Sequence, residues 1–78
     1  MFVNCQGNVC KINMEIASEA PTICKIFTVQ GQLIATLINN EQLETSYHNL
    51  EYSLPKSGTY IIYLKNGNNI NIKKVVAL

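Results

Sequence analysis

Short alternating stretches separated by turn-forming residues constrain this sequence more than any other feature. Apolar and polar side chains alternate through most of residues 9–16, 22–29, 33–38, 48–54, 59–65 and 70–77, and glycine, asparagine or proline separates most of these stretches. A period of two is typical of a strand with one buried face, and turn signals every 8–12 residues or so indicate a sandwich or barrel. The sequence therefore predicts an all-β fold.

The strongest strand pattern lies at residues 59–65. Tyr60, Ile62 and Leu64 alternate on one face, while Ile61 and Tyr63 lie on the other. Because both faces are apolar, we expect a central strand or one that is covered on both sides. This placement favours core packing of the tyrosines over ligand stacking.

Turn chemistry places two hairpins and one ambiguous segment. Gly31 can adopt positive φ within residues 30–32, and Asn66-Gly67 is a strong short-hairpin signal. Pro21 ends the strand that precedes it, because proline has no N–H to donate. Residues 41–47 could hold a helical turn, but the segment is too short and polar for a core helix.

Length and charge limit the classes of protein to which the chain can belong. With 78 residues it forms a single domain, residues 1–78, and six lysines against five glutamates leave a net charge of +1. A balance this close to neutral argues against a nucleic-acid partner, and no apolar run approaches the roughly 18 residues of a membrane span. Without a signal-peptide pattern at the N-terminus, we expect a module of a longer protein, with a complete small cytosolic protein as the alternative.

The inventory of reactive side chains is poor. The chain has one histidine and no aspartate, arginine or tryptophan, so a Ser-His-Asp triad cannot be assembled. His48 is expected at a solvated loop edge, and the carboxylates Glu41, Glu44 and Glu51 at exposed positions where nothing raises a pKa. The four glycines stand singly, so no phosphate-binding loop is present. We therefore expect no enzyme and no cofactor.

Three cysteines leave several arrangements open. Cys10 and Cys24 fall on alternating apolar faces, which favours small buried hydrophobic residues. A disulfide between Cys5 and Cys10 is an alternative, because the four residues between them could turn the chain. A zinc site from all three thiols and His48 has suitable ligand types but no ligand spacing typical of zinc sites.

Three segments resemble the motifs of a known family and have the same order and spacing. Cys24-Lys25-Ile26-Phe27-Thr28-Val29-Gln30-Gly31-Gln32-Leu33-Ile34 is similar to its V-x-I-Y-D-x-x-G-[RK]-x-V hairpin. Leu54-Pro55-Lys56-Ser57-Gly58-Thr59-Tyr60 resembles its L-P-x-G-x-Y element, with one extra residue before the glycine. Asn66-Gly67 followed by Lys73-Lys74-Val75-Val76-Ala77-Leu78 resembles its closing segment. The family is the C-terminal sorting domain of cargo for the type IX (Por) secretion system of the Bacteroidetes.

Two positions depart from the family's pattern. Thr28 stands where family members usually carry aspartate, and Gln32 where they carry arginine or lysine. The Pro-Asn-Pro that often precedes the first strand does not occur.

The resemblance implies an immunoglobulin-like antiparallel β-sandwich of about seven strands at the end of a secreted cargo. It implies a non-catalytic targeting domain that passes through the periplasm, with the cargo then secreted or held at the cell surface. The implied partners are the outer-membrane secretion machinery and a sortase-like peptidase, without membrane insertion.

The resemblance also implies which residues matter. The terminal strand would be read by strand addition, and the motif residues would shape the turns. The residues expected to be recognised are Lys73, Lys74, Val75, Val76, Ala77 and Leu78. The motif residues are Gly31, Leu54, Pro55, Gly58, Tyr60, Asn66 and Gly67.

Other interpretations remain open at this point. Lys73-Lys74 could simply be a solvated edge that discourages strand addition, and an edge-strand dimer is conceivable. The alternative function is an immunoglobulin-like structural or adhesive module that binds protein or glycan. Such a module would carry an apolar or aromatic patch at one end of the sandwich.

Overall fold

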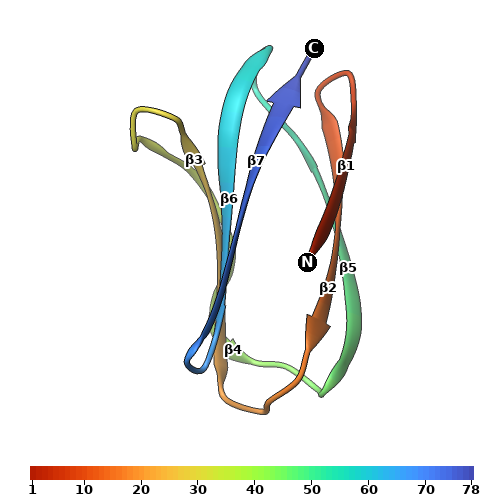
Figure 1. Cartoon of the computed structure of the whole chain (residues 1–78), viewed down its shortest axis with the longest axis vertical. Coiled ribbons are helices and arrows are strands. Elements are labelled where there is room, and N and C mark those ends of the chain that lie inside the picture. The colour runs from red at the N-terminus through yellow and green to blue at the C-terminus, as the bar shows by residue number, and fades with distance from the viewer.

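Seven antiparallel strands form two sheets in the computed structural model, which describes residues 1–78 (Figure 1). The strands are β1 (Phe2–Gln6), β2 (Val9–Ile16), β3 (Pro21–Thr28), β4 (Leu33–Gln42), β5 (Ser46–Ser53), β6 (Gly58–Asn66) and β7 (Asn69–Ala77). One sheet has the order β1-β2-β5 and the other β4-β3-β6-β7. The connections β2–β3, β4–β5 and β5–β6 cross between the sheets, which makes the immunoglobulin-like sandwich that the sequence predicts.

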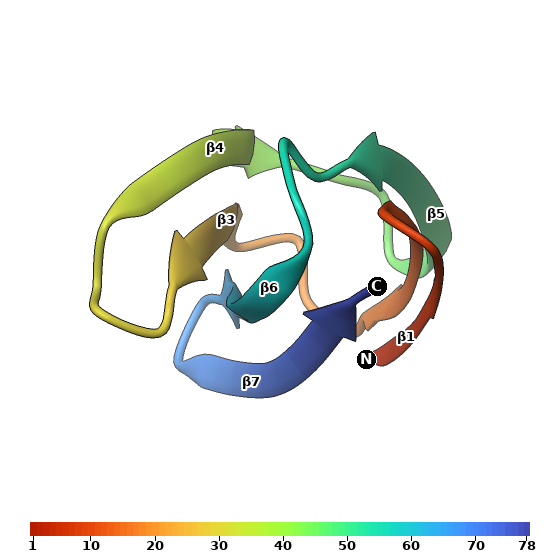
Figure 2. The same ribbon diagram turned by 90° about the horizontal axis from the view of Figure 1, so that it is seen from above.

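The core lies between the two layers, which are seen from above in Figure 2. Every second residue of β2 is buried, and the same holds for β3 and β6 in the facing sheet. Tyr60, Ile62 and Leu64 of β6 are at most 2% exposed, as their alternation predicts. The inward-facing residues of these three strands are Cys10, Ile12, Met14, Ile16, Thr22, Cys24, Ile26, Tyr60, Ile62, Leu64 and Asn66.

The prediction that β6 is a central strand is confirmed. It pairs with β3 on one side and with β7 on the other. Its second apolar face, which carries Ile61 and Tyr63, is only half-buried and forms part of the outer surface. The core packing that the sequence favours for the tyrosines is therefore confirmed for Tyr60 and wrong for Tyr63.

The helical turn that residues 41–47 could hold does not form. β4 continues to Gln42, and β5 begins at Ser46. The backbone stays extended because Glu41 and Gln42 pair with Thr22 and Pro21 at the start of β3. Asn40 has a φ of 54°, and register shifts along β3 and β4 bend this edge strand.

The strand β1 is not among the six stretches that the sequence indicates. Gly7, with a φ of 62°, lies in the tight turn that folds the N-terminal residues back along β2. Cys5 and Cys10 become direct cross-strand partners, with Cα atoms 4.0 Å apart, and their side chains form a disulfide. Cys10 is therefore buried, as one interpretation expects, but it is bonded to Cys5 rather than free.

Removing the disulfide tests how much this hairpin contributes to stability. Because the bond closes a six-residue loop, we expect the double variant C5A/C10A to lose about 2 kcal/mol of unfolding free energy, as the loop-entropy relation gives. Urea denaturation measures the loss. Reductant should lower the stability of the unmodified chain to a similar extent and leave the double variant unchanged. Equal stability of the variant and the oxidised chain would contradict this assignment.

Candidate functional site

The terminal strand β7 closes the four-stranded sheet. It pairs with β6 along its whole length, and no second strand of that sheet borders its other edge. Beyond β7, the backbone N–H of Leu78 donates to the carbonyl oxygen of Gly7 at 3.1 Å, which holds the chain end against the β1–β2 turn. The strand is therefore fixed in place. Strand β1 lies near it, but no strand pairs with its outer edge.

Side chains at the end of β7 divide between the two faces of the sheet. Lys73 and Lys74 are both exposed, but they are opposite Ile62 and Ile61 of β6 and so point to different sides. Val75 is half-buried and Ala77 is buried on the core side. The exposed residues of the last six are Lys73, Lys74, Val76 and Leu78.

The β3–β4 hairpin turns at the position that the sequence predicts. Gly31 has a φ of 95° and donates its N–H to the carbonyl oxygen of Thr28. The Thr28 hydroxyl accepts a hydrogen bond from the N–H of Gln32 at 3.1 Å. Thr28 thus holds the turn with its side-chain oxygen, as an aspartate could at the same place.

The second motif forms the corner between β5 and β6. Tyr60 is buried at the start of β6, and its hydroxyl donates to the carbonyl oxygen of Lys56 at 2.8 Å, the arrangement known as a tyrosine corner. Leu54 is buried and exchanges hydrogen bonds with Asn8: its N–H donates to the Asn8 carbonyl, and the Asn8 side chain donates to the Leu54 carbonyl. Leu54 and Tyr60 therefore anchor this corner.

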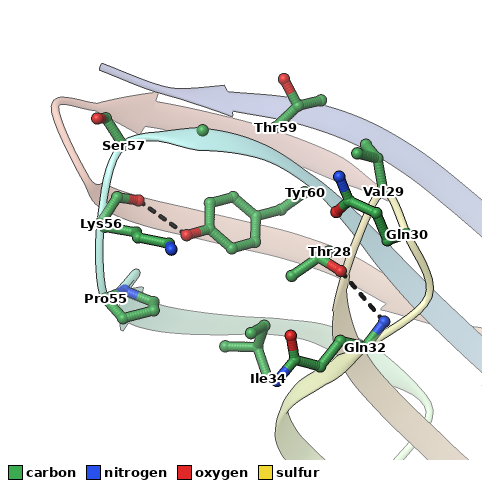
Figure 3. A pocket seen from close by; sticks show the side chains of 11 residues that line it. Thr28, Val29, Gln30, Gln32, Ile34, Pro55, Lys56, Ser57, Thr59 and Tyr60 are labelled. Atoms are coloured by element: carbon green, nitrogen blue, oxygen red, sulfur yellow. Dashed lines mark hydrogen bonds between the residues drawn. The ribbon is translucent and has the colours of Figure 1, made fainter.

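The first two motifs meet at one end of the sandwich. The hairpin and the corner border an open groove of about 460 Å³, shown in Figure 3. Pro55 and Gly58 line it together with Gln30 and Gln32, and most of its other residues are polar. This end therefore lacks the apolar patch that the adhesive-module alternative predicts.

The third motif forms the β6–β7 turn, with a change from the predicted position. Asn66 pairs with Asn69, so the two-residue loop is Gly67-Asn68, and Asn66 is the last residue of β6. Gly67 has a φ of 60°, and an added Cβ would lie 3.0 Å from the Cβ of Ala20. Glycine is therefore favoured by both conformation and space.

The Asn66 side chain is the connection that the sequence reasoning missed. It is 4% exposed, and its oxygen accepts from the N–H of Ser18 at 3.2 Å. Its nitrogen donates to the carbonyl oxygens of Ser18 and Ala20 and to the Thr22 hydroxyl, at 3.0–3.2 Å. The sequence does contain a signal for this network, because the polar residues Thr22 and Asn66 fall at inward-facing positions of otherwise apolar strands.

The substitution Asn66→Ala tests this network. We expect a loss of about 2–3 kcal/mol in unfolding free energy, because the N–H of Ser18 loses its acceptor and the Thr22 hydroxyl loses one of its two hydrogen bonds. The exposed neighbour Asn68 is the matched control, and Asn68→Ala should change stability by less than about 0.5 kcal/mol. Equal losses in the two variants, measured by chemical denaturation, would show that the network is not stabilising.

The cysteines and the histidine do not converge. Cys5 and Cys10 are bonded to each other, whereas Cys24 is buried on β3 of the opposite sheet. His48 is half-buried on β5, and its Nε2 donates to the carbonyl oxygen of Glu44 at 2.7 Å. No group of three or more potential metal-ligating residues is present, so the zinc alternative lacks a site.

Burial raises the pKa of the Cys24 thiol from its ordinary 9.0 to about 11. We therefore expect iodoacetamide to leave this thiol unmodified in the oxidised, folded chain at about pH 8 and to modify it after unfolding. The unfolded chain releases this proton near pH 9.0, whereas the folded chain retains it, so stability should fall as pH rises above that value. Mass spectrometry counts the modified thiols, and rapid labelling of the folded chain would contradict the prediction.

Sequence comparison gives the family. The secretion system C-terminal sorting domain matches residues 4–77, nearly the whole chain. The chain belongs to this family. This type IX sorting domain therefore has its three motifs at the two ends of the sandwich, with the terminal strand between those ends.

Comparison of structures supports the fold alone. The sorting domain is similar to an uncharacterized protein from Bacillus anthracis str. Ames, known from a crystal structure at 1.4 Å resolution. The TM-score is 0.65 and the identity 16%, over 94% of this chain and 73% of the other. No curated protein sequence matches significantly. None of the elements is a helix that could cross a membrane.

Proposed function

We propose that this domain directs a secreted cargo protein through the type IX secretion system to the cell surface and has no catalytic role itself. The observation that carries the proposal is the family match over residues 4–77. The cargo would pass through the periplasm before it reaches the outer-membrane machinery. The Cys5–Cys10 disulfide is compatible with that route, because disulfides form and persist in oxidising compartments.

The element that the machinery reads is, on this proposal, the end of β7. Its outer edge pairs with no strand of the sandwich and would offer backbone N–H and carbonyl groups to a partner strand, with alternate side chains giving that pairing specificity. Lys73 and Lys74 place one positive charge on each side of the strand. Their placement favours a receptor that contacts both faces of the edge. A sortase-like peptidase would then separate the cargo from the domain.

An export assay tests the role of β7. A reporter fused to residues 1–78 should reach the surface of a host with a type IX system, and deletion of residues 73–78 should abolish export. Because the deletion also removes Val75 and Ala77 from the core side, K73S/K74S is the second variant. It should reduce export several-fold without changing the stability of the domain, because both side chains are exposed.

The matched control is Lys11→Ser, on the outer side of the other sheet, which should leave export unchanged. Full export after the deletion, or an equal effect of the control, would contradict recognition through β7.

A further inference from the structure

The two outer faces of the sandwich differ in chemistry. On the three-stranded sheet, eight of the eleven outward side chains are polar, and the three others are Phe2, Val9 and Tyr47. The polar residues are Asn4, Gln6, Lys11, Asn13, Glu15, Asn49, Glu51 and Ser53. This composition is typical of a face in contact with water. We compare the composition of the opposite outer face with it.

The outer face of the four-stranded sheet is apolar with interspersed lysines. Three cross-strand rows run over β3, β6 and β7, and each contains two apolar residues and one lysine. The rows, which together we call the lysine–apolar face, are Phe27–Ile61–Lys74, Lys25–Tyr63–Ile72 and Ile23–Lys65–Ile70. Each strand contributes one of the three lysines.

The β7 side of this face is open to solvent. Ile70 and Ile72 are 54% and 61% exposed, whereas Tyr63 at the centre is half-buried between its neighbours. At a strand spacing of about 4.8 Å and a rise of about 3.3 Å per residue, five residues on each of the three strands cover roughly 240 Å², lysines included. An exposed face with this share of apolar side chains on a small domain is often an interaction surface.

The charge of this face is uncompensated. It carries three of the six lysines and no carboxylate. All five glutamates lie elsewhere, on the three-stranded sheet, at the end of β4 or in the connections between strands: Glu15, Glu19, Glu41, Glu44 and Glu51. The near-neutral chain therefore concentrates positive charge on its most apolar face.

We propose that the lysine–apolar face docks onto a protein surface in which apolar side chains are flanked by carboxylates. Tyr63 is the central anchor, because tyrosine at the centre of a patch contributes strongly to binding. Lys25 and Lys65 would pair with the partner's carboxylates and set its orientation.

Two other occupants fit the face less well. A second copy of the chain would bring lysines against lysines, which disfavours association. A lipid surface would take up the apolar side chains, but Lys25 lies on an interior strand next to Tyr63 and would be drawn into the bilayer without a counter-charge. Carboxylates of a protein partner can reach between apolar side chains and satisfy these lysines.

The test uses the isotopically labelled 78-residue chain and two short designed helices as probes. Both helices carry leucine and phenylalanine on one side, flanked by glutamates in one helix and by lysines in the other. We expect the acidic helix to shift the NMR signals of outward residues of β3, β6 and β7, and the basic helix to bind at least about tenfold more weakly.

Charge reversal makes the test specific. K25E/K65E should weaken binding of the acidic helix about tenfold and strengthen binding of the basic helix. Lys11→Glu, on the opposite outer face, is the matched control and should change neither affinity. Lys74 belongs both to this face and to the end of β7, so it is left unchanged here. Because neither substituted lysine is in residues 73–78, the result is separable from recognition through the end of β7.

Several results would overturn the proposal. These are no binding of the acidic helix, equal binding of both helices, or the same effect from Lys11→Glu. Self-association through this face, seen in sedimentation and removed by Tyr63→Ser, would assign it to a second copy. Binding to vesicles of anionic lipid that K25E/K65E abolishes, without binding to the acidic helix, would assign it to a membrane.

Discussion

The packing of β2 against β3 and β6 is the interaction on which the rest of the structure depends. Four consecutive inward side chains of β2, from Cys10 to Ile16, lie over the inward side chains of two strands in the facing sheet. A chain of this length buries a smaller fraction of its surface than a larger domain does, so this one double layer supplies most of the hydrophobic stabilisation. The outer strands β1, β4, β5 and β7 then attach by pairing to these three.

Polar connections complete the two ends of this layer. At one end, Asn66 binds the backbone of the β2–β3 connection, and at the other, Asn8 and Leu54 join the β1–β2 turn to the β5–β6 corner. Two residues of the sorting-domain motifs, Leu54 and Asn66, make these connections. Both therefore have a structural role in the fold.

Alternation predicted most of the fold from the sequence. The pattern Tyr60, Ile62 and Leu64 identifies both the position and the buried face of β6, because packing on one side of a sheet selects every second residue. Alternation did not identify the strand residues within 41–47, because polar side chains on an edge strand resemble those of a loop or a short helix. β1 was missed because its place depends on pairing with β2, and its sequence alternates weakly.

The features of the site that the sequence did not predict depend on hydrogen bonds between residues far apart in the chain. Asn66 was assigned to the turn because Asn-Gly usually occupies the two central turn positions. Its partners Ser18 and Ala20 are more than forty residues away in the sequence, and no local pattern identifies them. The same holds for the contact of Leu78 with Gly7, which fixes the terminal strand.

Strand β7 is a folded part of the sandwich, and its outer edge pairs with no other strand. Residue-by-residue amide hydrogen exchange of the isolated domain tests it most directly. Because an antiparallel edge strand points alternate N–H groups toward its single neighbour, exchange should alternate between slow and fast along Asn69–Ala77 and be slow throughout β3 and β6. Uniformly fast exchange in β7 would show that the strand is frayed, and uniformly slow exchange would show that its outer edge is covered; either result would contradict the account.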